Sequence, residues 1–214
     1  MARTISFDYE RALDRATALF WKNGYAQTAL RDLLKVMEIG EGSFYNTLKS
    51  KKDLYLACLQ RYDDKELRVR MEALASAPTA AEGIRAFFKL ALDRLDDPNT
   101  PSRLCMMAAT AAEDVLADAE LRDRAEKGFE DVRSRMRERL TQDRDRGVLP
   151  ESMDPVATAS VITTYLQGLW RSALVAYNRA EFERQIDALL TGLGLPATGV
   201  AGGSPAKKRA PRKQ

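Results

Sequence analysis

Apolar residues recur at three- and four-residue spacing in four blocks over the first 75 residues, which predicts a run of short helices. The expected helices cover residues 7–23, 28–38, 41–48 and 51–75. Gly24 follows the first block, as is typical of a helix C-terminus. Thr28 and Ser50 precede the second and fourth blocks, where a hydroxyl can cap a helix N-terminus. Two glycines near residue 40 predict a tight turn between the second and third helices.

Beyond Pro78 the apolar blocks become longer, and no stretch alternates apolar and polar residues as a strand does. The expected helices cover residues 80–95, 102–116, 118–146, 155–177 and 181–193. The helix over 155–177 has apolar residues on nearly every side, so it requires burial on several faces. The pattern predicts an all-α fold.

Composition removes several classes of function. The chain contains no histidine, which excludes serine-triad and histidine–zinc chemistry. Its two cysteines, Cys58 and Cys105, are too far apart for a CxxC site, and this pattern fits a reducing cytosol. We find no signal peptide and no bilayer-spanning stretch, and we expect a cytoplasmic protein with no membrane partner, no metal and no cofactor.

Charge is distributed unevenly along the chain. The net charge is +3, but residues 196–214 hold five basic and no acidic residues. Residues 1–52 hold nine basic residues against six acidic ones, which leaves the central part acidic. The N-terminal part is therefore expected to meet a polyanion. The tail is expected to be disordered, and it either attracts phosphates nonspecifically or is simply solvated.

Two short helices joined by a glycine-containing turn and followed by lysines have helix-turn-helix spacing. A helix that enters the major groove needs small or polar residues at its tip, and residues 41–43 meet that need. The next polar side chains can reach sugars or phosphates, and the lysine that begins the following helix favours a phosphate. The candidate DNA contacts in this stretch are Glu41, Gly42, Ser43, Tyr45, Asn46, Thr47 and Lys51.

This segment resembles the DNA-binding domain of TetR-family transcriptional regulators. The resemblance lies in Gly24-Tyr25, Thr28, Leu33-Leu34 and the run I-G-E-G-S-F-Y-N-T-L-K-S-K-K-D-L-Y over 39–55. It implies that Thr28 and Tyr45 touch phosphates, that residues 41–43 face bases and that Lys51 anchors the DNA backbone. It also implies about nine helices in three parts: a three-helix DNA-binding domain over 1–52, an effector-binding and dimerisation domain over 53–195, and a tail over 196–214.

Three residues depart from the family pattern. Glu38 stands where glycine is frequent, Leu48 where phenylalanine is frequent, and Glu41 where a basic or neutral residue is common. A carboxylate repels phosphates and accepts hydrogen bonds only, so its natural base partner is the N4 amino group of cytosine. We therefore hypothesise that Glu41 selects a C·G pair in each half-site.

One helix-turn-helix offers little surface for tight binding, so a homodimer on a two-fold, palindromic operator is expected. The apolar helices over 155–177 and 181–193 are the candidate four-helix interface, as the resemblance also implies. The alternative is that the first of these helices is core of a single subunit. The candidate interface residues are Val161, Tyr165, Leu169, Trp170, Leu174, Phe182, Ile186 and Leu189.

The helices over 80–146 are expected to surround an effector pocket. Its candidate residues are Tyr62, Phe87, Phe88, Cys105, Met106, Met107, Thr110 and Tyr165. Met and aromatic side chains at helical spacing also form ordinary core, so both interpretations stay open. The resemblance implies that a small apolar or electrophilic ligand in this pocket weakens operator binding.

Cys105 follows Arg103 near the start of an expected helix, and it resembles a branch of the family in which such a cysteine senses oxidants or electrophiles. The positive end of a helix and a nearby arginine both stabilise a thiolate. A buried, inert thiol is the alternative, and Cys58 is expected to belong to the core.

Two other classes of protein compete with a one-component regulator. An enzyme is excluded because GxSxG, GxxxxGK, HExxH and the Rossmann glycine pattern are all absent. A helical protein-interaction module without specific DNA binding is the remaining alternative. Repression is favoured over activation by the resemblance alone.

Overall fold

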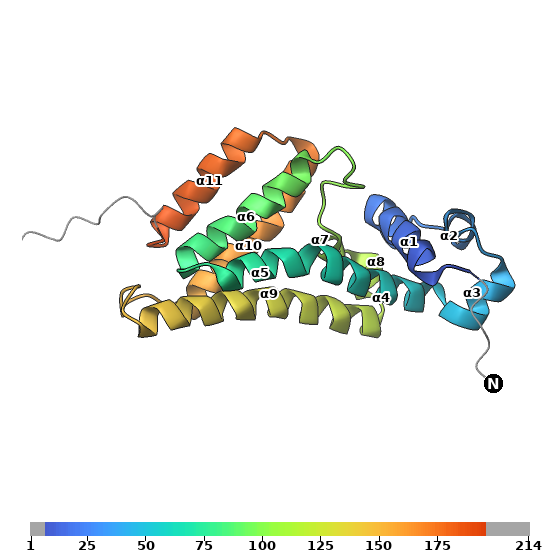
Figure 1. The fold of residues 1–214 in the computed structure, drawn as a ribbon, viewed down its shortest axis with the longest axis horizontal. Helices are drawn as coiled ribbons and strands as arrows, with labels where there is room; N and C mark the ends of the chain where they lie inside the picture. Colours follow the sequence, from blue (N-terminus) through green and yellow to red (C-terminus); the bar gives the residue numbers. More distant parts are fainter. Residues whose placement is uncertain (1–6, 196–214) are drawn as a thin grey trace, which may run out of the picture.

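The computed structural model describes residues 7–195, and all regular structure in that range is helical (Figure 1). The predicted all-α fold is confirmed. The prediction of a disordered basic tail concerns residues 196–214, which lie outside the described range.

Three short helices form one end of the molecule (Figure 1): α1 (Tyr9–Asn23), α2 (Leu30–Met37) and α3 (Glu41–Leu48). The Asp8 carboxylate caps α1 by accepting the Arg11 N–H, and Gly24 ends this helix at a φ of 80°. The side chains of Phe20, Leu33 and Phe44 are fully buried in this part of the molecule. Their burial supports the predicted three-helix unit.

The prediction that Thr28 caps the second helix is wrong. The N-cap of α2 is Ala29, and no side chain bonds to this helix end. The Thr28 hydroxyl donates instead to the Gly24 carbonyl oxygen at 2.6 Å. That carbonyl is a strong acceptor beside the end of α1, so Thr28 closes the turn between the two helices.

A long helical rod follows, and it connects the three-helix end to the rest of the molecule. It consists of α4 (Lys51–Tyr62), the π-helical turn η1 (Asp63–Leu67) and α5 (Arg68–Ser76). Ser50 caps it as predicted, because its hydroxyl accepts the Asp53 N–H at 3.0 Å. The sequence predicted one uninterrupted helix here, and η1 is the difference.

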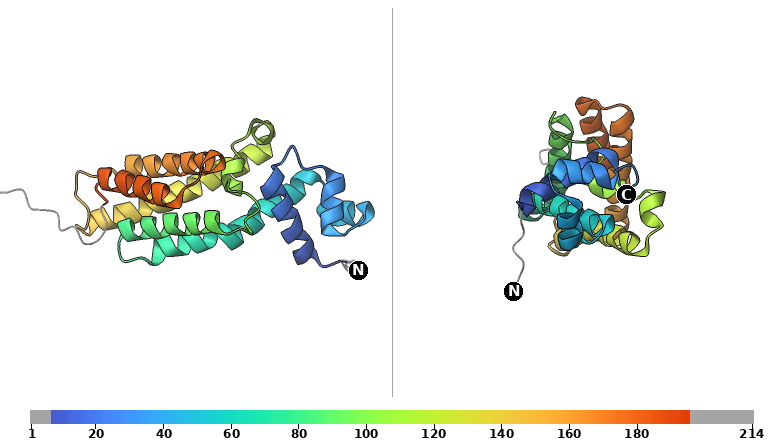
Figure 2. Two further views of the ribbon diagram at one scale, coloured as in Figure 1. Left: turned by 90° about the horizontal axis from the view of Figure 1, so that it is seen from above. Right: turned by 90° about the vertical axis from the view of Figure 1, so that its right-hand side faces the viewer.

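Four longer helices build the other end: α6 (Ala80–Asp96), α9 (Ala119–Asp145), α10 (Pro155–Val175) and α11 (Arg179–Gly192). Figure 2 shows them running roughly along the long axis, beside α5. The backbones of α5 and α6 approach closely at Gly83, where a Cβ atom would lie 2.5 Å from the Leu74 carbonyl oxygen. Only glycine fits at that position without displacing backbone.

The helix expected over 102–116 is broken. The stretch forms two one-turn helices instead, α7 (Met106–Ala109) and α8 (Glu113–Leu116). The Arg171 guanidinium on α10 donates to the carbonyl oxygens of Ala108 and Ala111, at 3.4 Å each. In a continuous helix these carbonyl oxygens would accept backbone N–H groups of the next turn. The spacing of apolar residues in this stretch therefore does not predict its structure.

Candidate DNA-binding surface and effector cavity

Helix α3 lies at the extreme end of the molecule (Figure 1). Most of its exposed residues are polar. Phe44 and Leu48 are buried beneath it, as expected of core residues. Tyr45 is 53% exposed although it is a large aromatic residue, which leaves its hydroxyl free for a partner. Among the predicted contacts on α3, four are exposed and two are partly buried: Glu41, Gly42, Tyr45 and Asn46, and then Ser43 and Thr47.

The lysines after α3 divide into two roles. Lys51 begins α4 beside α3, with its Nζ 4.5 Å from the centre of the Tyr25 ring, and partial burial lowers its pKa from the ordinary value. Lys52 is turned toward α9, where its Nζ lies 3.3 Å from an Asp118 oxygen and 2.9 Å from a Glu120 oxygen. Lys51 therefore lies over the Tyr25 ring next to α3, whereas Lys52 is engaged by two carboxylates of the same molecule.

Thr28 is fully buried, with its hydroxyl on the Gly24 carbonyl. A side chain with no exposed surface cannot meet a phosphate in this conformation. The prediction that Thr28 is a DNA contact is corrected for this reason.

The three-helix end is attached to the stretch 104–118, which we call the junction segment. The Trp21 indole N–H on α1 donates to the Leu104 carbonyl oxygen at 2.7 Å. The Ala26 N–H donates to the Asp114 carboxylate at 3.0 Å. These two bonds transmit movement of the segment to α1 and to the turn after it, and the ion pair of Lys52 with Asp118 ties the segment to the start of α4 as well.

The same segment contributes a wall to a small cavity of about 30 Å³ between α5, α6, α9 and α10. Three predicted pocket residues line it: Phe87, Cys105 and Met107. The other five do not, namely Tyr62, Phe88, Met106, Thr110 and Tyr165. The lining residues that the sequence did not single out for the pocket are Leu67, Arg70, Gly128, Phe129, Val132, Thr163, Leu166, Gln167 and Trp170.

These five corrections have physical reasons. The Thr110 hydroxyl donates to the Met107 carbonyl oxygen within its own turn. The rings of Phe88 and Tyr165 pack edge-on against each other, with their centres 5.9 Å apart, and neither lines the cavity. Met106 is buried in the core. Tyr62 does not line the cavity, but its hydroxyl forms hydrogen bonds with Cys105 and Arg70, which do.

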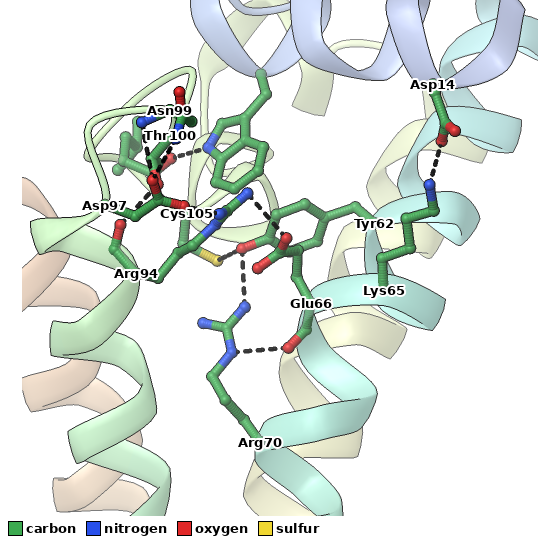
Figure 3. Close-up of polar contacts among 12 residues, drawn as sticks. Asp14, Tyr62, Lys65, Glu66, Arg70, Arg94, Asp97, Asn99, Thr100 and Cys105 are labelled. Carbon is green, nitrogen blue, oxygen red and sulfur yellow. Dashed lines mark hydrogen bonds and ion pairs between the residues drawn. The ribbon is translucent and has the colours of Figure 1, made fainter. Parts of the chain in front are cut away.

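Arg70 is the charged residue of the cavity wall, and it is 3% exposed. Its Nε donates to the Glu66 carbonyl oxygen and its Nη2 to the Tyr62 hydroxyl, both at 3.0 Å. The Tyr62 hydroxyl in turn donates to the Cys105 sulfur at 3.2 Å, so the three side chains form a connected series (Figure 3). Within residues 7–195 no carboxylate forms a salt bridge with Arg70, and the Glu66 carboxylate pairs with Arg94 at 3.0 Å.

Aromatic rings surround this guanidinium. The ring centres of Tyr62, Phe87 and Trp170 lie 5.9, 6.0 and 5.7 Å from its central carbon. Burial lowers the pKa of Arg70 while the neighbouring Tyr62 and Cys105 raise it, with a net rise, so the side chain stays charged. Such rings favour a cation but do not neutralise it.

The two cysteines differ in setting. Cys58 is fully buried, and burial raises the pKa of its thiol to about 12. Cys105 lines the cavity at 7% exposure and accepts the Tyr62 hydroxyl. The expectation of Cys58 as core is supported, and Cys105 is the thiol that a ligand in the cavity would meet.

The predicted interface residues fall into two groups. Leu169, Trp170, Phe182 and Ile186 are buried inside the single subunit, so their assignment to a dimer contact is corrected. An all-round apolar helix does not reveal which of its faces is internal, and here the subunit core takes these four. The other four stay accessible on α10 and α11: Val161 at 44%, Leu174 at 48%, and the half-buried Tyr165 and Leu189.

An exposed polar helix after a tight turn, a lysine at the next helix start and a separate helical bundle with a cavity together define a helix-turn-helix DNA-binding regulator. Family comparison agrees. Residues 12–58 match the model described as bacterial regulatory proteins, tetR family, and residues 80–189 match the model described as tetracyclin repressor-like, C-terminal domain. The chain belongs to the TetR family of transcriptional regulators, which are not enzymes.

Several known proteins resemble most of the chain. An uncharacterized HTH-type transcriptional regulator, YezE of Bacillus subtilis, is 28% identical over 89% of this chain and 98% of its own length. The HTH-type transcriptional repressor ComR of Escherichia coli is 25% identical over 78% of this chain and 80% of its own. Among solved structures, a cysteine mutant of the TetR-family regulator CifR in complex with a 26-base-pair operator DNA superposes with a TM-score of 0.79 at 28% identity, covering 90% of this chain and 98% of that one.

Two further findings concern residues 7–195. No helix there is long and apolar enough to cross a membrane. That part of the chain also holds no group of three or more Cys, Asp or Glu side chains arranged to bind a metal ion.

Proposed function

We propose that this regulator is a cytoplasmic repressor that binds a palindromic operator as a homodimer and is released when a small molecule enters the cavity beside Cys105. The observation that carries the proposal is the double role of the junction segment. One of its ends forms the cavity wall through Cys105 and Met107, and the segment also holds the three-helix end through Leu104 and Asp114.

The proposed DNA contacts are the outward face of α3 and Lys51. Glu41, Gly42 and Ser43 face bases, Tyr45 contacts a phosphate, and Asn46 and Thr47 lie beside it on the same helix. The predicted division into a DNA-binding domain over 1–52 and an effector and dimerisation domain over 53–195 is kept as part of this proposal.

The proposed dimer contact is the outer face of α10 together with the adjoining side of α11. The exposed positions of α10 are small or apolar over most of its length, and Val175 is 90% exposed. Gly168 has open space where a Cβ atom would stand, so a second helix can approach closely there. Apolar surface of this kind is typical of a subunit interface.

Occupation of the cavity is proposed to shift α7, because a closed space of about 30 Å³ has no room for a molecule larger than about one water. Displacement of α7 pulls on the Trp21–Leu104 hydrogen bond and changes the position of α1. Ligand and operator then prefer different conformations, which is the requirement for one to release the other.

A covalent route to the same movement is proposed at Cys105. Cys105 lines the cavity, and its sulfur accepts the Tyr62 hydroxyl at 3.2 Å. An electrophile that adds to the sulfur would insert its own bulk into the cavity.

The DNA-binding proposal is tested by selecting binding sites for the full chain from random duplex DNA. We expect an inverted repeat to be enriched and to bind at least about 10³-fold more tightly than unrelated duplex. Tyr45→Ala and Lys51→Ala should each weaken operator binding, whereas Lys89→Ala, which removes one charge from the exposed face of α6, should not. Recovery of unrelated sequences only, or equal loss in all three variants, would contradict the proposal.

The base assignment has its own test. Operator variants with each base pair substituted are bound to wild type and to Glu41→Gln. We expect the substitution to relax the preference for one C·G pair in each half-site and leave other positions unchanged. Identical preferences for the two proteins would remove Glu41 from base recognition.

The dimer is tested by light scattering during size-exclusion chromatography at low concentration. Val161→Glu should yield monomers, and Val148→Glu, at a similarly exposed valine outside α10, should stay dimeric. A monomeric wild type would refute the proposed assembly.

Effector control is tested with a mild electrophile, N-ethylmaleimide, on operator-bound protein. We expect release from wild type and from Cys58→Ser but not from Cys105→Ser. Retained binding by treated wild type, or equal release from all three proteins, would exclude the covalent route.

A further inference from the structure

The cavity contains a buried positive charge with no salt-bridge partner among residues 7–195, because the Glu66 carboxylate, which acts on it through charge alone, is paired with Arg94. Arg70 is 3% exposed, and no carboxylate of residues 7–195 forms a salt bridge with it. Two of its nitrogens bond to neutral oxygens, those of the Glu66 backbone and the Tyr62 hydroxyl, and its Nη1 makes no hydrogen bond to the described residues (Figure 3). Buried charges are ordinarily paired, so this arrangement calls for an anion.

The rest of the cavity wall is poor in charge. Arg70 is the one ionised side chain among its lining residues. Most of the others are apolar: Leu67, Phe87, Met107, Phe129, Val132, Leu166 and Trp170. One positive charge in an apolar wall matches one negative charge on an apolar body, and a dianion would leave its second charge uncompensated.

Space for such a body can be made at one place. Met107 projects its methyl group into a notch on α9 at Gly128, where a Cβ atom would overlap it. A methionine side chain has three rotatable bonds and adapts readily, so its withdrawal adds to the space that the proposed shift of α7 opens. This enlargement lies beside Arg70, since both residues line the same cavity.

We propose that Arg70 and Tyr62 form an anion subsite of the effector cavity, and that the effector is a small monocarboxylate with an apolar body. The carboxylate accepts from Nη1 of Arg70 and from the Tyr62 hydroxyl, which turns from the Cys105 sulfur to the ligand. This inference rests on the proposed function, since it names the chemical class that enters the same cavity.

The test measures binding without DNA. Thermal unfolding of the full chain is followed at constant ionic strength and pH 7 with acetate, butyrate, octanoate, benzoate and phenylacetate, each against its uncharged amide. We expect at least one carboxylate to raise Tm in a saturable manner, with no matching rise from its amide. Absence of any difference between acids and amides would overturn the subsite.

Variants locate the binding. Arg70→Met should weaken binding of the active carboxylate at least tenfold, and Arg70→Lys should recover part of it because the charge returns. Arg139→Met, at a partly buried arginine of α9 outside the cavity wall, is the matched control and should bind as wild type does. Met107→Ala, which enlarges the notch, should shift preference toward the longer acids. Unchanged binding by Arg70→Met would refute the proposal.

The same carboxylate is then added to operator-bound protein. Binding that releases no operator would leave the anion subsite in place and remove the proposed effector control. Operator release by an amide with no acid effect would keep effector control and remove the anion subsite.

Discussion

Trp21→Phe is expected to loosen the attachment of the three-helix end to the junction segment. Phenylalanine keeps most of the ring but removes the N–H that donates to the Leu104 carbonyl oxygen at 2.7 Å. Leu104 is partly buried, so its carbonyl is left with incomplete access to water. A lost hydrogen bond with such an orphaned acceptor costs about 1.5 kcal/mol, which lowers Tm by about 3–6 °C in a chain of this length.

Trp170→Phe provides the matched control. Trp170 is as buried as Trp21, and no hydrogen bond of its indole N–H is present within residues 7–195. Both variants lose similar ring area and weaken one cation–ring contact, that of Trp21 with Arg94 at 5.1 Å and that of Trp170 with Arg70 at 5.7 Å, so the main remaining difference between them is the hydrogen bond. The measurement is urea unfolding followed by circular dichroism, at a fixed protein concentration because a dimer would couple stability to concentration. Equal destabilisation of the two variants would refute the attributed role of the bond.

Two further predictions follow from packing and charge. Gly83→Ala should destabilise the fold by about 1–3 kcal/mol in urea unfolding, because the Leu74 backbone cannot move away from the new methyl group. Gly42→Ala, which has open space around it, is the control and should be neutral or stabilising. Equal effects of the two substitutions would refute the close approach of α5 and α6. The Arg61 guanidinium, which bonds both Asp14 oxygens at 2.7 and 3.1 Å, is the main cause that holds the pKa of Asp14 below its ordinary value. A carboxyl group whose pKa is lower in the folded than in the unfolded state stabilises the fold at pH values above the unfolded pKa, which is about 3.9 for Asp. This stabilisation is lost as the pH falls through the folded-state pKa. Asp14→Asn should therefore be about 1 kcal/mol less stable than wild type at pH 7 after solvent screening, with the gap closing below about pH 4, and a gap independent of pH would contradict this.

The helices of the N-terminal end could be predicted closely because local signals decide them. Gly24 ends α1 and Ser50 begins α4, as the sequence indicates. The prediction for Thr28 was wrong because its hydroxyl can either accept an N–H at the start of α2 or donate to a carbonyl oxygen. It donates to the Gly24 carbonyl, whose position depends on α1 and the turn that follows it.

The cavity was harder to predict, since its members depend on contacts between distant helices. Arg70 precedes Leu74 by four residues, so the two share one helix face. That spacing was the available signal for burial of Arg70, but an arginine on an apolar face is ordinarily assigned to the surface. At the break between α7 and α8, Arg171 of α10 contacts the backbone, and no local sequence pattern reveals that contact.

The turn η1 allows the rod to lose one residue without changing the phase of the helices on either side. A π-helical turn accommodates one extra residue while the α-helices on either side keep their phase. Deleting one residue within Asp63–Leu67 would thus regularise the rod and leave Arg70 facing Tyr62. The same deletion inside α4 or α5 would rotate everything beyond it by about 100°. At η1, chain length can therefore change during evolution without altering how the three-helix end and the remaining helices are aligned.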